Sequence, residues 1–173
     1  MTATVERMLN IPILSACGID DHDHIERLSD RMQFKSGEVI LQEGQVDRAL
    51  WLLISGTCEV IKRGHQQEDQ QLAILEAGSV FGEMSFLHPA PHSASVKALT
   101  RVEIAKITPN AFEALRKESP AAAYCVLTHL VQLLSDRLRR MDERICEELE
   151  ESPAERQQEW HDFRARLFAG DYN

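Results

Sequence analysis

The spacing of apolar residues changes along the chain and separates predicted helices from predicted strands. Before residue 34, apolar residues recur at helical intervals, and Asp20 or Asp21 is the predicted cap of a helix that continues through Ile25, Leu28 and Met32. From Phe34 to Ile107 they instead alternate with polar residues or form short runs. Short strands of this kind at regular spacing are typical of a β-sandwich or jelly roll.

Short strands and glycine-containing turns follow one another through this region. The strand candidates are residues 39–41, 49–54, 58–61, 72–75, 95–98 and 102–105. The turns between them contain Gly37, Gly44, Gly56, Gly64 and Gly78. Glycine suits such turns because it reaches positive φ without steric cost.

A pair of helices is predicted after the strands. Thr108 is a suitable cap with Pro109 at the first helical position, and Pro120 opens a long helix that ends near Glu150. One stripe of this helix has heptad spacing: Leu127, Val131, Leu134, Leu138, Met141 and Ile145. The stripe predicts a homodimer seam, with packing of the helix on its own roll as the alternative. Leu130 and Leu133 lie off the stripe and could pack on the roll.

The remaining residues predict a short amphipathic helix. Ser152 to Glu155 reads as a capping box, and Gly170 lies just past the expected end. Its apolar face contains Trp160, Phe163, Leu167 and Phe168. We expect this face to dock on the domain or on a dimer mate, with a protein partner or a pocket lid as the alternatives. The predicted organisation is therefore an N-terminal helical segment (1–33), a β-roll (34–118), a dimerisation helix (119–150) and a tail helix (151–173).

Composition and charge exclude several classes of function for this protein. The 173 residues include 28 acidic and 19 basic side chains, for a net charge of −9. The one basic cluster, Arg137, Arg139 and Arg140, has acidic neighbours, which argues against direct nucleic-acid binding. No apolar run approaches the ~20 residues of a membrane span. Residues 1–10 lack a signal-peptide pattern, so we expect a cytoplasmic protein.

Two patterns resemble metal or disulfide sites, and we expect neither. Cys17, Cys58, Cys125 and Cys146 are scattered without a Cys-x-x-Cys pair, so each is predicted to be a small, buried or semi-buried apolar residue. His22 and His24 alternate with Asp21 and Asp23. However, histidines two residues apart do not share a helix face, and acids in a first turn favour the helix dipole.

Residues 81–96 are the most informative segment of the chain. Gly82-Glu83 opens this segment and Pro91-His92-Ser93-Ala94 closes it. It resembles the phosphate-binding cassette of the cyclic-nucleotide-binding domain family, found in catabolite activator protein, kinase regulatory subunits and nucleotide-gated channels. The glycine motifs at 35–44, 53–60 and 78–83 carry the same resemblance, which runs from about Phe34 to Leu115.

The resemblance implies a ligand and a set of contacts. In the family, the glutamate accepts a hydrogen bond from the ribose 2′-hydroxyl, an arginine pairs with the cyclic phosphate, and backbone N–H groups face the phosphate. The expected ligand residues here are Gly82, Glu83, Met84, Ser85, His92, Ser93 and Ala94, with cyclic AMP preferred over cyclic GMP. The alternative for Glu83 is that it organises the cassette without a ligand. Residues 140–143 lack the family's Thr-Ser pair, so its adenine contact does not carry over.

His92 stands where the family has its arginine. An imidazole donates two hydrogen bonds only when it is protonated, and an unperturbed pKa of ~6.5 leaves most histidines neutral at pH 7. Binding is therefore expected to be weak and pH-dependent. Lys97 is a poor substitute because alternation places it opposite Val96, and Arg101 is expected in a turn.

The functional prediction is a non-enzymatic regulatory or sensor module. No paired catalytic carboxylates, nucleophile elbow or metal cluster is present in the sequence, and His92 with Glu83 is the one imaginable acid–base pair. Residues 151–173 are too few for the winged helix-turn-helix of the family's transcription factors, so a free-standing module is expected. The alternative is a degenerate domain that acts as a homodimeric scaffold or protein-interaction module without nucleotide.

Overall fold

A computed structural model describes residues 11, 14, 17–64, 68–150 and 152–169, without the side chains of Ile19, Asp20, Glu155 and Phe168. The chain divides into two units, Met1–Leu130 and Val131–Asn173. Unit 1 contains a β-roll with helices α2 (Ile19–Leu28), α3 (Glu83–Leu87) and α4 (Pro109–Glu118). The helix α5 (Pro120–Glu150) begins in unit 1 and continues into unit 2, which also contains α6 (Ala154–Phe168).

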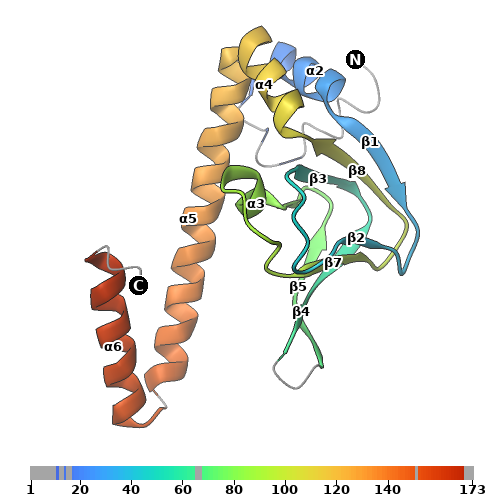
Figure 1. Cartoon of the computed structure of the whole chain (residues 1–173). Coiled ribbons are helices and arrows are strands. Elements are labelled where there is room, and N and C mark those ends of the chain that lie inside the picture. The colour runs from blue at the N-terminus through green and yellow to red at the C-terminus, as the bar shows by residue number, and fades with distance from the viewer. Residues whose placement is uncertain (1–10, 12–13, 15–16, 65–67, 151, 170–173) are drawn as a thin grey trace. The chain divides into compact units, whose positions relative to one another are not determined.

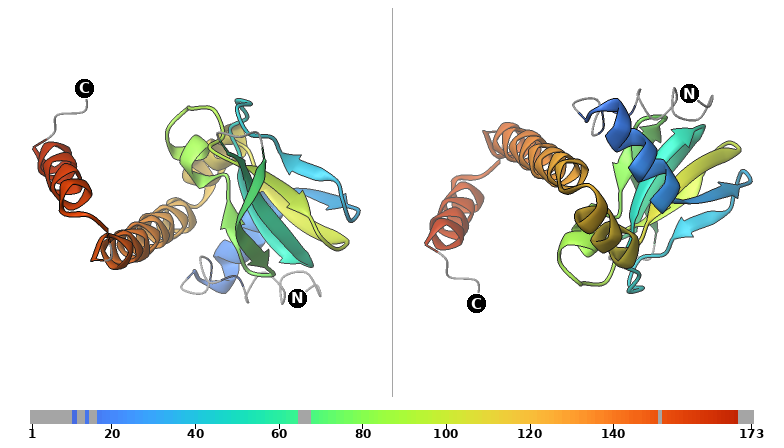
Figure 2. Two further views of the ribbon diagram at one scale, coloured as in Figure 1. Left: turned by 90° about the horizontal axis from the view of Figure 1, so that it is seen from below. Right: turned by 90° about the horizontal axis from the view of Figure 1, so that it is seen from above.

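Two four-stranded antiparallel sheets form the roll (Figures 1 and 2). The first has the order β1-β8-β3-β6, built from β1 (Asp30–Phe34), β8 (Val102–Ile107), β3 (Leu50–Ser55) and β6 (Val80–Phe81). The second has the order β2-β7-β4-β5, built from β2 (Val39–Leu41), β7 (Ser95–Ala98), β4 (Thr57–Arg63) and β5 (Asp69–Glu76). The predicted jelly roll with flanking helices and a long C-terminal helix is confirmed.

All six predicted strands are present, but the sequence reading missed β1 and β6. The helix predicted through Met32 was wrong at its end, because α2 stops at Leu28 and Met32 pairs with Ile104 of β8. Met32 lies four residues after Leu28, so its packing against the core mimics helical spacing. The predicted cap was also wrong, since Gly18 is the N-cap and Asp21 accepts a hydrogen bond from the Gly18 N–H at 3.0 Å.

The core lies between the two sheets. Its buried residues come from six of the eight strands and from Ala49 just before β3, and they include Leu41, Trp51, Leu53, Cys58, Phe81, Val96 and Ile104. Leu50 and Leu52 are also fully buried, so the central strand β3 is covered on both faces. This double burial explains why the apolar run at 49–54 is continuous rather than alternating.

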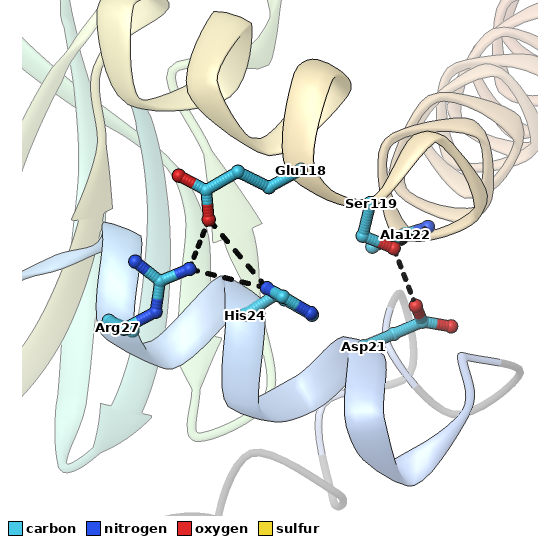
Figure 3. A network of polar contacts seen from close by, with 6 residues as sticks. All are labelled: Asp21, His24, Arg27, Glu118, Ser119 and Ala122. Atoms are coloured by element: carbon cyan, nitrogen blue, oxygen red, sulfur yellow. Dashed lines mark hydrogen bonds and ion pairs between the residues drawn. The ribbon is translucent and has the colours of Figure 1, made fainter.

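Polar contacts join α2 to α4 and to the start of α5 (Figure 3). Arg27 forms an ion pair with Glu118, and His24 Nδ1 lies 3.8 Å from the same carboxylate. The Ser119 hydroxyl donates to Asp21 Oδ1 at 2.9 Å and accepts from the Ala122 N–H at 3.2 Å. Asp21 and His24 therefore serve the helix junction, while His22 is fully buried.

Ser119→Ala should destabilise the protein, because Ser119 caps α5 and also anchors Asp21. Loss of a serine cap costs about 0.5–2 kcal/mol, which lowers Tm by roughly 2–4 °C for each kcal/mol in a chain of this size. Calorimetry measures this shift. The matched control is Ser135→Ala, an exposed serine inside α5; equal Tm values for the two variants would contradict the capping role.

The prediction that no cysteine is half of a disulfide was wrong for one pair. Cys17, just before α2, is bonded to Cys125 of α5, with their Cα atoms 5.9 Å apart. The two are 108 residues apart in sequence, so no local spacing signals the pairing. Cys58 is buried as expected, and Cys146 is a partly buried free thiol.

In unit 2, α6 packs back on the end of α5. The Gln157 side chain donates to the carbonyls of Leu149 and Ser152, each at 3.0 Å, and Arg164 lies 3.3 Å from Asp142. The capping box was wrong, because Pro153 is the N-cap without a side-chain cap bond. Trp160 stacks on Phe163 at 5.3 Å, whereas the Phe168 side chain and Gly170 lie outside the described residues.

Candidate nucleotide-binding site

The cassette begins at a backbone reversal that requires glycine. Gly82 has φ of 75°, in the left-handed region, and is the N-cap of α3. A Cβ atom at this position would lie 2.7 Å from Trp51 Cδ1 and 2.8 Å from the Ala49 carbonyl oxygen. Glycine therefore lets the chain turn directly from β6 into α3 while it touches β3.

The short helix α3 has one buried face and one exposed face. Glu83, Ser85 and Phe86 are at most 5% exposed, whereas Met84 is 59% exposed. Phe86 packs edge-to-face on Phe112 of α4, with ring centroids 5.4 Å apart. Because of this packing, the carboxylate-bearing side of the cassette faces the protein and is linked to the helical part of unit 1.

His92 lies inside the cassette and is 6% exposed. Its Nδ1 is 3.0 Å from the Ser85 hydroxyl oxygen. Its backbone is held by the 44–45 turn, since its N–H donates to the Gln45 carbonyl and its own carbonyl accepts from the Gly44 N–H, both at 2.9 Å. Nε2 is buried and has no hydrogen-bond partner among the described residues.

The predicted ligand residues thus divide into two groups. Gly82 shapes the turn, Glu83 is buried, and Ser85 and His92 are buried in contact with each other. Met84 and Ser93 are exposed, and Ala94 is partly buried. The sequence reading missed Trp51 beside Gly82 and the exposed Arg48, which donates to the Phe86 carbonyl at 3.1 Å. No motif marks these two residues, because their proximity to the cassette depends on strand pairing.

Neither alternative cation takes the place of the missing arginine. Lys97 alternates with the buried Val96 and Ala98 and lies 3.8 Å from Glu59. Arg101 donates to Gln33 at 2.6 Å. A cavity of about 460 Å³ lies on the Lys97 face of the sheet β2-β7-β4-β5 and includes none of the predicted ligand residues.

The two-sheet jelly roll and the glycine-opened cassette between β6 and β7 together define the class of domain to which this chain belongs. The sequence pattern of the cyclic nucleotide-binding domain matches residues 31–119. This chain belongs to that family.

Named relatives agree with this assignment. A cAMP-dependent protein kinase regulatory subunit from Emericella nidulans is 32% identical over 105 residues, covering 61% of this chain and 25% of the relative. The cyclic AMP receptor protein of Thermus thermophilus is 28% identical over 135 residues, covering 78% of this chain and 61% of that protein. The chain thus spans about a quarter of the length of the kinase subunits it matches.

Solved structures have the same architecture. The Thermus thermophilus catabolite activator protein superposes with a TM-score of 0.70 at 28% identity, covering 78% of this chain and 61% of that one. A cyclic nucleotide-binding domain from Methylobacillus flagellatus has a TM-score of 0.73 at 26% identity, covering 84% of this chain and 82% of that one. None of the helices that the structure describes is long and apolar enough to cross a membrane.

Proposed function

We propose that the protein is a non-enzymatic regulatory module that binds a cyclic nucleotide through the cassette, cyclic AMP ahead of cyclic GMP. The observation that carries this proposal is the environment of the His92 side chain. Its side chain is buried in the cassette, and Nε2 has no partner among the described residues. Buried polar groups are nearly always hydrogen-bonded, so a ligand phosphate oxygen would complete this site. Relatives named for cyclic AMP make that nucleotide the first to test.

The His92–Ser85 contact sets how the imidazole would meet a phosphate. When His92 is neutral, its single N–H is on either Nδ1 or Nε2, so only one tautomer can donate to a ligand. When it is protonated, Nδ1–H donates to the Ser85 hydroxyl oxygen while Nε2–H is free to donate to the phosphate. A protonated imidazole also carries a positive charge opposite the negative phosphate, so Coulomb attraction adds to the hydrogen bond. Affinity should therefore rise as the pH falls.

Calorimetric titration of cyclic AMP and cyclic GMP at pH 7.5 and pH 5.5 tests this proposal. We expect weak cyclic AMP binding at pH 7.5 that strengthens by about fivefold or more at pH 5.5. Adenosine serves as the matched control, because it lacks the phosphate and should show no such gain. Absence of nucleotide binding at both pH values would refute the sensor and favour a domain that acts as a scaffold without nucleotide.

We further propose that a second copy of the chain covers the heptad stripe of α5. Val131, Leu138 and Met141 are 60%, 60% and 55% exposed in the single chain. Three large apolar residues at heptad spacing suit a two-fold helix seam, in which each residue is used twice. This surface also supports the scaffold function, which would use the same dimer without a nucleotide.

Leu138→Glu should convert the dimer into a monomer. In a two-fold seam the substitution introduces two buried carboxylates, which should weaken association by at least about a hundredfold. Sedimentation equilibrium measures the association constant. Ser135→Glu adds the same charge at an exposed position off the stripe. A native protein that is monomeric, or equal weakening by both variants, would contradict the seam.

A further inference from the structure

The Cys17–Cys125 disulfide has no role in the proposed nucleotide site. It joins the residue just before the N-cap of α2 to the helix α5. Cys17 directly precedes the N-cap of α2, and Cys125 lies in the second turn of α5. Both residues are partly exposed rather than sealed in the core. A small thiol or disulfide in solution can therefore approach this pair, unlike the fully buried Cys58.

A continuous series of contacts connects the disulfide with the cassette. The helix α2, which follows Cys17, is joined to the end of α4 by Arg27, His24 and Glu118, and by Asp21 with Ser119 (Figure 3). The α4 ring of Phe112 packs on Phe86 of the cassette helix α3. Formation or loss of the Cys17 disulfide should therefore affect the helices that support the cassette.

His129 gives the two sulfurs different chemistry. Its Nδ1 lies 2.8 Å from the Cys125 carbonyl oxygen and 3.7 Å from Cys125 Sγ. An Nδ1–H that donates to the carbonyl also lies beside the sulfur, where it favours negative charge on Cys125. A stabilised thiolate is the better leaving group when a disulfide is reduced.

We propose that Cys17 and Cys125 form a reversible redox site that exchanges with low-molecular-weight disulfides and locks α2 to α5. In the oxidation, the Cys125 thiolate attacks one sulfur of the small disulfide and releases one small thiolate. The Cys17 thiolate then attacks Cys125 Sγ, forms the protein disulfide and releases the second small thiolate. Two electrons pass from the protein thiols to the small disulfide, and the released thiolates take up the two protons.

Formation of this disulfide should stabilise the protein and slow local opening where α2 meets α4. A disulfide that closes a loop of about a hundred residues restricts the unfolded chain strongly, which predicts a rise in Tm of about 10 °C. Backbone amides of α2 and α3 should exchange at least about tenfold more slowly in the oxidised protein, because local opening must break the contacts described above.

The test equilibrates the full chain in glutathione buffers of increasing oxidised fraction, followed by alkylation at pH 8 and mass spectrometry. Burial raises the pKa of the Cys58 thiol to about 11, so this residue should stay unlabelled in the folded protein. We expect Cys17 and Cys125 to lose alkylation together, without added glutathione mass on either, whereas the free thiol Cys146 is either alkylated or carries one glutathione. Dithiothreitol should restore alkylation of all three.

Calorimetry and hydrogen exchange on the two redox forms complete the test. Cys17→Ser and Cys125→Ser should both abolish the redox-dependent Tm shift, whereas the control Cys146→Ser should retain it. Persistence of both thiols in fully oxidised glutathione would overturn the proposal, as would identical Tm and amide exchange in the two forms. Nucleotide is absent from every measurement, so failure of the sensor proposal leaves this result interpretable.

Discussion

His92→Arg is expected to raise the affinity for cyclic AMP at pH 7.5 by about ten- to a hundredfold. A guanidinium is permanently charged and can donate two parallel hydrogen bonds to a phosphate. A net gain of about 1.5–3 kcal/mol for hydrogen bonds to a charged group corresponds to this range. Calorimetric titration provides the dissociation constant, and the pH dependence of the native protein should disappear in the variant.

His88→Arg is the matched control for this prediction. His88 follows α3 in the same cassette but is exposed, so the substitution adds the same charge outside the buried site. An equal gain in both variants would indicate general electrostatic attraction rather than a phosphate contact at position 92. A thermal scan checks that the buried position tolerates arginine. A folded His92→Arg protein that fails to bind would overturn the sensor proposal.

Gly82→Ala is expected to destabilise the protein by about 2–5 kcal/mol. The left-handed backbone costs a residue with a Cβ about 1–2 kcal/mol. Overpacking against Trp51 and the Ala49 carbonyl, which the new atom would meet at 2.7 and 2.8 Å, adds about 1–3 kcal/mol. Urea denaturation measures the free energy of unfolding.

Gly37→Ala separates backbone strain from overpacking as causes of the stability loss. Gly37 also has a positive φ, 89°, but a Cβ atom there meets nothing within 4 Å. Its replacement should therefore cost only the backbone strain, about 1–2 kcal/mol. Equal losses at the two positions would show that contact with Trp51 and Ala49 contributes nothing, and would contradict the packing described for the start of the cassette.

Gly82→Ala and His92→Arg also show how the fold supports the site. Gly82 determines where α3 begins, and α3 carries Glu83 and Ser85 into the protein. Ser85 in turn contacts the His92 imidazole. A disturbance at Gly82 should therefore lower both stability and nucleotide affinity, whereas His92→Arg should raise the affinity.

Local patterns in the sequence were sufficient for most of the fold. Alternating or short apolar runs identified six strands, because side chains two residues apart share a sheet face. Thr108 was predicted as a cap, and its hydroxyl accepts from the Ala111 N–H. Five glycines of the turns and cassette, Gly37, Gly44, Gly56, Gly78 and Gly82, do have positive φ. Each of these features depends on a few neighbouring residues.

Tertiary structure decided what depends on distant residues. Met32 fits a helix by spacing, but pairing with Ile104 makes it part of a strand. Cys17 and Cys125 carry no mutual signal over 108 residues, and the packing of α2 against α4, which leads directly into α5, brings them together. The orientation of His92 follows from its backbone bonds to the 44–45 turn and its contact with Ser85. The sequence therefore determined the cassette and its missing arginine, while long-range packing determined that the replacing histidine is buried there.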